Sequence, residues 1–520
     1  MIGFHIDMNI AQFTRPYLEK WLRQLALLGY DTIIWEVENN IKWDTCPECA
    51  SPDAFTKDEF REILALCRSL DLEPVPLFQT IGHAEYVLKH DKYKHLAELP
   101  DRIDQYCPRH GDLMPFLHEW IDEYLELFEP IEYFHLGADE AWTLGSCPKC
   151  KQYAKEHSLS ALYVDHVNAV AAPLVRRGVT PVIWADMLLH YYEALDSLSR
   201  DIVLFDWQYD IHHGQGRFWV WGREYHTAET VPPDISHEFG RFIFPHGDEP
   251  GRHGETFYTA DYLAAKGFKV VKCPSSSSYG DNVFSPRNYY HMVNTFDSAR
   301  KGLEGHLEGV VLTSWTVHLF PWELQLAMID MPPYLSEHPR ASIGAFEDAF
   351  MKARFGLTDE RFWRACGLLS KRCLFTYTAS LGFDKSAPAV PLDHVAKTIA
   401  KVKSEGRLSA EAENCRARLA EYREALSLFE ALSRRVGEGS DILAFWILAA
   451  KNLANRARAT LALISAATGD KVDVSDIRKE MRVLRKDTEE LYAGIMKPAR
   501  RKEMLDWMFA SMEAALKALP

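Results

Sequence analysis

The chain has 520 residues, of which 47% are hydrophobic, so it can bury a large domain of roughly 250 to 350 residues and a second one. A net charge of −15 with no basic stripe excludes nucleic acid as a partner. No apolar run approaches the ~20 residues of a transmembrane helix, and no secretory leader precedes the first predicted strand. We therefore expect a cytoplasmic protein that binds neither membrane nor nucleic acid.

Short β-rich runs alternate with helical periodicity along roughly the first 330 residues, as in βα units on a parallel sheet. Strands are predicted at residues 3–8, 31–37, 73–79, 133–137, 180–186, 201–207, 268–274 and 309–315. Helices are predicted at residues 16–28, 57–70, 116–128, 160–177, 257–266, 287–301 and 342–355, with a Gly- and His-rich insertion at 209–254. Such an alternation of eight strands with helices predicts an α/β fold, a (β/α)8 TIM barrel.

Helical patterns dominate after about residue 357, and strand signals nearly vanish. Helices are predicted at residues 395–403, 409–434, 441–467, 475–492 and 502–519. We expect the barrel to span residues 1–356 and an all-α C-terminal domain to span 357–520, with a homodimer through the helical domain as one use of it.

Two adjacent carboxylates, Asp139 and Glu140, follow the predicted strand at 133–137. Neighbouring side chains at a strand end point in different directions, so the two acids can take different roles. Repulsion between two close carboxylates also favours keeping one of them protonated. A proton donor beside an anion is what glycosidic cleavage requires, whereas an arbitrary Asp-Glu pair is usually a surface turn.

The residues His135, Gly137, Ala138, Asp139 and Glu140 resemble the strand-4 motif His-x-Gly-Gly-Asp-Glu of glycoside hydrolase family twenty, whose members are barrel β-N-acetylhexosaminidases. Ala138 in place of the second Gly is a mild departure. The resemblance implies that Glu140 is the general acid/base, that Asp139 holds the substrate's 2-acetamido group and that His135 is among the substrate-binding residues. The acetamido oxygen would then attack C1 and form an oxazolinium ion, a known exception to the mechanism with two carboxylates.

Further matches to the family fall at other predicted strand ends. His83 follows the third strand in a Gly-His pair and resembles the family histidine that supports the acid/base region. Tyr279 and Asp281 follow the seventh strand and resemble the family Tyr-x-Asp, in which the Tyr bonds the acetamido oxygen and the Asp bonds sugar hydroxyls. A packing His and a Ser/Gly-rich loop with an incidental Tyr are the alternative interpretations.

Tryptophans end three of the predicted strands. Trp184, Trp207 and Trp315 occupy positions at which the family encloses the acetamido methyl and the sugar ring, and three around one mouth favour such a box over simple packing. Asp186 and Asp206 flank two of them and are candidates for positioning loops or binding the ligand.

Two residues depart from the family pattern at positions where the family binds outer sugar hydroxyls. Ile2 stands where the family has Arg, and Val317 stands where it has Glu after the eighth strand. Glu323 is the candidate substitute for that Glu. The sequence offers further carboxylates for such contacts, namely Asp7, Glu36 and Glu38.

Two Cys-x-x-Cys pairs follow the second and fourth strands and suggest a metal site that the family does not generally have. Cys46 with Cys49 and Cys147 with Cys150 supply four thiolates, the number that a closed tetrahedral structural Zn²⁺ requires. Both loops leave the same face of a barrel and could meet there. Unmetallated cysteines and a redox dithiol are the alternatives, and the fallback ligands are Cys107 and His110.

The pattern predicts an exo-acting, retaining β-N-acetylhexosaminidase that removes terminal β-linked GlcNAc or GalNAc from a glycan without a catalytic cofactor. One alternative is a barrel glycosidase with its own carboxylate nucleophile and another sugar. The other is a catalytically inactive carbohydrate-binding module, which the intact Asp139 and Glu140 pair disfavours.

Overall fold

The structure is a computed structural model that describes residues 1–245, 254–316, 321–381 and 390–519. Eight parallel strands close into a barrel in the order β1-β2-β3-β4-β5-β6-β9-β11, and β11 pairs with β1 to complete the ring. The predicted barrel is therefore confirmed. Its strands are β1 Ile2–Asp7, β2 Thr32–Glu36, β3 Glu73–Leu77, β4 Tyr133–His135, β5 Thr180–Trp184, β6 Val203–Trp207, β9 Val270–Cys273 and β11 Gly309–Ser314.

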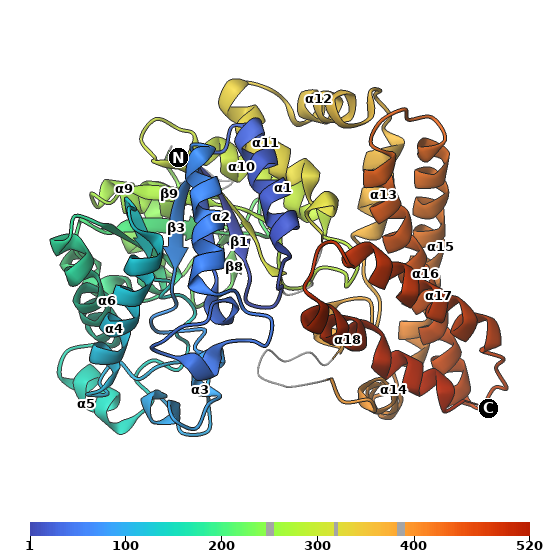
Figure 1. The fold of residues 1–520 in the computed structure, drawn as a ribbon, viewed down its shortest axis with the longest axis horizontal. Helices are drawn as coiled ribbons and strands as arrows, with labels where there is room; N and C mark the ends of the chain where they lie inside the picture. Colours follow the sequence, from blue (N-terminus) through green and yellow to red (C-terminus); the bar gives the residue numbers. More distant parts are fainter. Residues whose placement is uncertain (246–253, 317–320, 382–389, 520) are drawn as a thin grey trace.

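Helices cover the outside of the barrel (Figure 1). The helices of this part of the chain, which include short ones in the loops, are α1 Arg15–Leu28, α2 Lys57–Ser69, α3 Glu85–Leu88, α4 Leu113–Phe128, α5 Pro148–Glu156, α6 Leu159–Arg176, α7 Asp186–His190, α9 Tyr258–Ala265, α10 Asn288–Gly302, α11 Leu326–Glu337 and α12 Ile343–Phe355. The sequence pattern missed α11, which contains Pro332 and Pro333, because proline inside a helix removes a backbone donor and argues against one.

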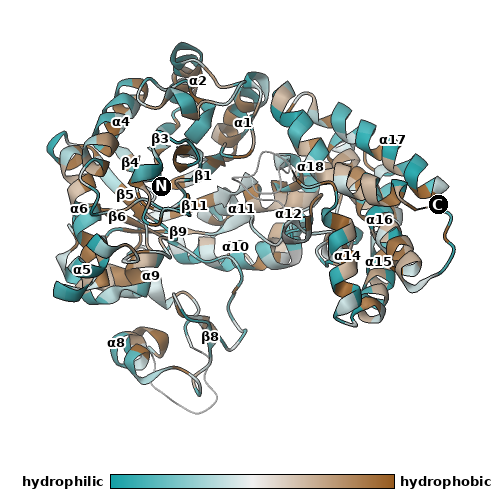
Figure 2. Cartoon of the chain, turned by 90° about the horizontal axis from the view of Figure 1, so that it is seen from below, coloured by the Kyte–Doolittle hydropathy of each residue, from teal (hydrophilic) through white to brown (hydrophobic). Residues whose placement is uncertain are grey.

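The insertion after β6 folds into a small unit at one edge of the barrel (Figure 2). It holds an antiparallel pair, β7 Phe218–Trp219 with β8 Tyr225–His226, followed by α8 Pro233–Ile243. A further short strand, β10 Ser275–Ser277, extends β9 and pairs with β11. Because β6 ends at Trp207, the insertion that holds β7, β8 and α8 starts at the carboxyl end of the barrel strands.

Apolar side chains from alternate strand positions fill the barrel interior. This inner cluster includes Val75, Leu77, Val182, Phe205 and Val311, all buried. The interior is thus a packed core rather than a pore, and the loops at the carboxyl ends of the strands are left to form a site.

Beyond α12 the described chain is built of helices and the loops that connect them, which confirms the predicted helical C-terminal region (Figure 1). They are α13 Arg361–Leu369, α14 His394–Ser404, α15 Leu408–Ser433, α16 Ser440–Thr468, α17 Ser475–Tyr492 and α18 Pro498–Lys517. The domain boundary after residue 356 stays a prediction. Within the described ranges, none of the helices has the length and apolar character needed to cross a bilayer.

The helical region packs directly on the barrel. Between α17 and α18 the chain returns to the β1–α1 loop, where Lys497 N–H donates to Gln12 O over 2.7 Å and Thr14 N–H donates to Ile495 O over 2.8 Å. Phe284 and Phe509 contact each other across the two regions, with ring centroids 5.7 Å apart. One continuous apolar cluster consequently runs from the outer layer of the barrel into the C-terminal helices.

Candidate active site

The two predicted acids lie on a sharply bent segment just after β4. Gly137, Ala138 and Glu140 have φ values of 63°, 73° and 47°, which non-glycine residues rarely adopt. A Cβ on Gly137 would lie 1.9 Å from Gln79 Oε1, so this position has no room for a side chain. The Tyr163 hydroxyl donates to Ala138 O over 2.7 Å and holds the bend from below.

His83 joins the two carboxylates. Its Nε2 lies 3.2 Å from Asp139 Oδ2 and 3.3 Å from Glu140 Oε2, and its own φ is 53°. The preceding residue, Gly82, packs on the acid segment so closely that a Cβ would lie 2.1 Å from Asp139 O. The structure therefore brings the three predicted residues together, with the β3 loop seated directly on the β4 loop.

Asp186 braces the pair from the end of β5. Its Oδ2 accepts the Glu140 N–H over 3.0 Å, and its Oδ1 accepts the Trp207 indole N–H over 3.4 Å. Burial, followed by the nearby charge of Asp139, raises the pKa of Asp186 well above its usual range. Asp206, the other flanking carboxylate, is buried in an ion pair with Lys272 at 2.8 Å and has a structural role.

A cavity of about 440 Å³ opens above these residues at the carboxyl ends of the strands. It is lined by four carboxylates, four aromatic rings and three other polar residues: Glu36, Asp139, Glu140, Asp210, Trp207, Tyr209, Tyr279, Trp315, Asn9, His83 and Ser278. Apolar ring faces opposite acids suit a sugar, which has both C–H faces and hydroxyl groups.

The aromatic wall is held together by its own contacts. Trp207 and Tyr209 stack with centroids 4.9 Å apart at 27°, and Trp315 donates its indole N–H to the Tyr209 hydroxyl over 3.0 Å. Tyr279, 66% exposed, completes the lining of the wall. The predicted positions of Trp207, Tyr279 and Trp315 at one cavity are thus observed.

Trp184 and His135 are placed below the cavity and not on its lining. Both are fully buried, with ring centroids 4.4 Å apart, and Trp184 lies 5.9 Å from Trp315. Burial, followed by the charge of His5, lowers the pKa of His135 well below its usual range. The expectation of direct sugar contacts for these two residues is wrong, because they support the floor of the cavity instead.

Two other predicted sugar ligands point elsewhere. Asp281 is fully buried and bonds Arg287 Nε at 2.9 Å and His291 Nε2 at 2.8 Å. Glu323 accepts the Tyr17 hydroxyl at 2.9 Å and pairs with Lys20 Nζ at 2.7 Å. The predictions that Asp281 and Glu323 bind sugar hydroxyls are therefore corrected, since strong partners hold both carboxylates away from the cavity. Val317 lies outside the described residues.

Sequence reasoning missed several lining residues. Tyr209 and Asp210 follow Trp207 by two and three residues, so the period of the strand could have placed Tyr209 beside Trp207. Asn9 and Ser278 carry no such signal. Glu36, considered only as an outer-hydroxyl ligand, lies at the cavity and is bonded by His5 Nε2 at 3.0 Å and Gln79 Nε2 at 3.1 Å.

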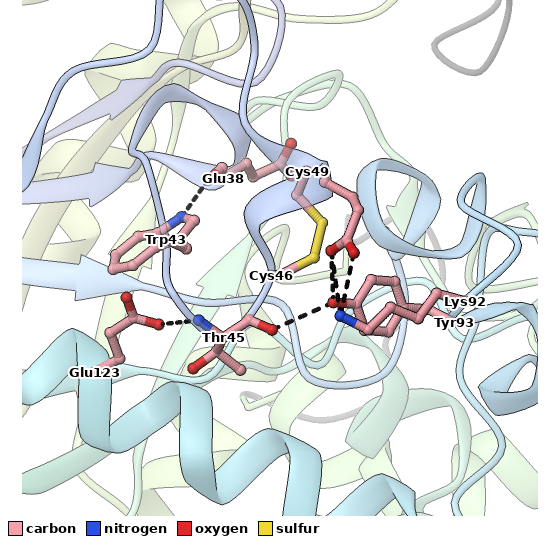
Figure 3. The surroundings of a disulfide bond; sticks show 9 residues. Glu38, Trp43, Thr45, Cys46, Cys49, Lys92, Tyr93 and Glu123 are labelled. Atoms are coloured by element: carbon pink, nitrogen blue, oxygen red, sulfur yellow. Dashed lines mark hydrogen bonds and ion pairs between the residues drawn. A yellow bond between two sulfur atoms is a disulfide. The ribbon is translucent and has the colours of Figure 1, made fainter.

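The predicted set of four metal-binding cysteines is not assembled. Cys46 and Cys49 form a disulfide beside Tyr93, whose hydroxyl donates to Thr45 O (Figure 3). Cys147 and Cys150 lie instead with Cys107, one of the two fallback ligands. The ligand set of Cys46, Cys49, Cys147 and Cys150 is therefore wrong, because the β2 loop closes its own cysteine pair.

The comparisons with known proteins agree with this site. A model of the glycosyl hydrolase family 20 catalytic domain matches residues 37–217. The chain is 30% identical over 238 residues to a protein named hexosaminidase D from Bos taurus, covering 42% of this chain and 69% of that one. Hexosaminidase D from Homo sapiens is 30% identical over 189 residues, covering 35% of this chain and 39% of that one.

Among solved structures, a chitobiase from Flavobacterium johnsoniae aligns over 98% of this chain and 78% of its own, with 15% identity and a TM-score of 0.46. The sequence match to the bovine protein spans more than two thirds of that relative, and the family model covers both acids after β4. The chain belongs to glycosyl hydrolase family 20 and is a glycoside hydrolase.

Proposed function

We propose that the protein is an exo-acting, retaining β-N-acetylhexosaminidase that removes a terminal GlcNAc or GalNAc residue with the help of the substrate's own acetamide. The observation that carries this proposal is the state of Asp139. Its Oδ2 is beside His83, whereas its Oδ1 is buried and has no hydrogen-bond partner among the described residues. Such a buried acceptor calls for a donor, and the 2-acetamido N–H supplies one.

Asp139 then orients the nucleophile of the substrate. A carboxylate that accepts the amide N–H turns the amide oxygen toward C1 and stabilises the positive charge that develops on the amide. The resemblance implies Tyr279 as the donor to the amide oxygen, but we assign that role to Tyr209. The Tyr209 hydroxyl accepts the Trp315 N–H, so its own proton can be donated to the amide oxygen from the opposite wall. The reacting groups would thereby be held in a near-attack geometry.

Glu140 supplies the proton. Its side chain is 40% exposed and lines the cavity, so it can reach the glycosidic oxygen. In the first step the amide oxygen bonds to C1, the glycosidic bond breaks, and the Glu140 proton passes to the leaving oxygen. In the second step Glu140 takes a proton from water, and the water oxygen attacks C1. The bond between C1 and the amide oxygen breaks, so the oxazolinium ring opens and the configuration at C1 is retained.

A thiazoline derivative of N-acetylglucosamine tests this mechanism, because it mimics the oxazolinium ring. We expect the protein to hydrolyse nitrophenyl N-acetylglucosaminide or its galacto isomer. The thiazoline should inhibit this reaction competitively, with an inhibition constant well below the KM of the substrate. In contrast, a barrel glycosidase with its own nucleophile would not be inhibited by the thiazoline and would form a covalent adduct with a 2-fluoro sugar. That adduct, found by mass spectrometry on Glu36 or Asp210, would sink the proposal.

Asp139→Asn provides the second test. The amide places an N–H where the carboxylate accepted one, so turnover should fall by ~10²-fold or more. A variant that stays within a few-fold of wild type would contradict participation of the acetamide. Glu85→Gln, an acid on α3, serves as the matched control.

The cellular location and the oligomeric state are separate proposals, which follow the expectations from the sequence. We propose a cytoplasmic enzyme acting on glycans that end in an N-acetylhexosamine, with the helical region as a homodimer interface. Cell fractionation and sedimentation at micromolar concentration test the two proposals. A secreted pool or a monomer, respectively, would contradict them.

A further inference from the structure

A second cluster of functional groups lies outside the cavity, between the β3–α4 and β4–α5 loops. Cys107 Sγ is 3.5 Å from Cys147 Sγ and 3.6 Å from Cys150 Sγ, and Glu98 Oε2 is 3.3 Å from Cys150 Sγ. The four ligand atoms all lie within 4.8 Å of one another. Glu98, Cys107 and Cys150 are at most 3% exposed.

Local backbone structure brings these four side chains together. An antiparallel bridge between Ala97 and Tyr106 sets Glu98 beside Cys107, and the Glu98 N–H donates to Gln105 O over 3.0 Å. Cys147 caps α5, because its Sγ accepts the Cys150 N–H over 3.3 Å. A thiolate that accepts a backbone N–H from the residue three positions on is also well suited to bind a metal.

The charge of the cluster lacks a counterpart in protein. Glu98 is 1% exposed, and its Oε1 accepts the Cys147 N–H over 2.9 Å, yet it forms no ion pair with any cationic side chain in the described ranges. A buried carboxylate without a cation is strongly unfavourable. Two buried sulfur atoms, of Cys107 and Cys150, and the half-buried sulfur of Cys147 add more anionic character as soon as any of them ionises.

We propose that Glu98, Cys107, Cys147 and Cys150 bind a structural zinc ion. With Zn–S bonds of about 2.3 Å, the sulfur atoms of a tetrahedral site lie about 3.8 Å apart, close to the spacing of Cys107 from its two neighbours. The fourth position is taken by a carboxylate oxygen. Four protein ligands leave no open position, so the ion is not catalytic. This set keeps Cys147 and Cys150 of the sequence prediction and takes Cys107 from its fallback ligands, while Glu98 is new and the disulfide pair and His110 are not part of it.

The zinc ion would fasten the loop of the acids to the loop of His83. Thr143, which lies between the acids and the cysteine ligands in the sequence, also joins the two loops, because its N–H and its hydroxyl both donate to Gln105 Oε1 at 2.9 Å. His83 bonds Glu140 from the same pair of loops. The ion thus positions the acid/base, a consequence that rests on the proposed function, whereas zinc content does not.

Metal analysis of the wild-type chain, purified without chelator, is the first experiment. We expect about one zinc per chain and an X-ray absorption shell of three sulfur atoms and one oxygen. Zinc below about a tenth per chain after reconstitution with ZnCl2 would overturn the proposal. A disulfide within Cys107, Cys147 and Cys150, found by mass spectrometry of unreduced protein, would overturn it as well.

Variants then identify the ligands. Cys150→Ser should lower zinc content at least tenfold, and Glu98→Gln should weaken zinc affinity tenfold or more in a competition with a chromophoric chelator. The matched control is the double variant Cys46→Ser with Cys49→Ser, which should keep a full zinc ion. Loss of zinc in that control with retention in Cys150→Ser would refute the assignment.

Hydrogen exchange gives a readout that needs neither activity nor a variant. Chelation of the wild-type ion should speed exchange at the amides of Cys107, Thr143 and Cys147 at least tenfold, and ZnCl2 should restore it. Amides of α16, outside the two loops, should not change. Unchanged exchange at all three amides after verified zinc removal would show that the ion does not fasten the loops.

Discussion

The two sides of the cavity are built in different ways. The acid side, formed by His83, Asp139, Glu140 and Asp186 at the ends of β3, β4 and β5, depends on rare backbone angles and close contacts of main chain with main chain. The ring side comprises Trp207, Tyr209, Tyr279 and Trp315, and it depends on stacking and on side-chain hydrogen bonds. Proton transfer requires fixed atoms, whereas a sugar ring tolerates small shifts of a stacking surface.

The largest effect should come from the acid side itself. Glu140→Gln removes the proton donor while it keeps the shape, so turnover of a disaccharide with a poor leaving group should fall by ~10²- to 10⁴-fold. Binding of a product sugar should change little. Steady-state kinetics and calorimetry check this, with exposed Glu119→Gln on α4 as the control. Near-normal turnover would remove Glu140 from the chemistry.

The next effect tests the close backbone contact. Gly82→Ala places a Cβ 2.1 Å from Asp139 O and should destabilise the fold by about 1–3 kcal/mol. Because that contact seats Asp139, turnover should also fall more than tenfold. Urea unfolding and kinetics measure both quantities. Gly111→Ala, in the same loop with nothing within 4 Å of the added Cβ, should leave both unchanged.

The stability of the fold should also depend on pH through His166, a buried residue of α6 that contacts the loop after β3. This residue bonds Thr80 O over 3.0 Å, and burial lowers its pKa from 6.5 to about 4. The unfolded chain binds this proton near pH 6.5, so below that pH it takes up more protons than the folded chain. Stability must therefore fall as the pH drops from about 6.5 to about 4, by up to about 3 kcal/mol from this group.

His166→Gln should remove that contribution and flatten the pH dependence of the unfolding free energy. Urea unfolding between pH 7 and pH 4.5 measures the slope. His237→Gln, the same change at an exposed position on α8, should keep the wild-type slope. Equal slopes in wild type and His166→Gln would mean that His166 is not the buried neutral group described.

A smaller effect is expected on the ring side. Tyr209→Phe removes the acceptor of the Trp315 N–H and a donor to the acetamide, so kcat/KM should fall about tenfold, or about 1.4 kcal/mol. Tyr279→Phe, at a ring that is 66% exposed, should change kcat/KM less than threefold. An equal loss in both variants would contradict the role of the Tyr209 hydroxyl.

The smallest change concerns the residue that departs from the family motif. Ala138 has a φ of 73°, which Gly adopts without strain. Ala138→Gly relieves that strain but loses a buried methyl and makes the unfolded chain more flexible, so unfolding should shift by less than about 1 kcal/mol. Thermal unfolding checks this. A loss above about 2 kcal/mol would mean that the methyl itself holds the acid segment.

Much of the fold could be predicted from the sequence, because the barrel strands are apolar runs with clear ends. Some elements that were missed lack such a signal, since α11 holds two prolines and β7 and β8 have two residues each. The short helices α5, α8 and α13 were missed as well. In the site, Asp139 and Glu140 could be located because they come directly after a strand. Side-chain direction could not be predicted, since Arg287 and Lys20 decide where Asp281 and Glu323 point.

The cysteines show the same limit. Spacing identified pairs of thiols but not the paths of the loops that bring Glu98 and Cys107 to Cys147. Glu98 carries no motif at all, and it becomes recognisable only through the bridge between Ala97 and Tyr106.

The hydrogen bonds between the β1–α1 loop and the segment after α17 have a consequence for how the chain unfolds. They tie residues near one end of the sequence to residues near the other, inside one continuous apolar cluster. The barrel and the helices should therefore melt together in a single cooperative transition. Deletion of α18 would remove the contact of Phe509 with Phe284 and would lower the stability of the barrel far from the point of deletion.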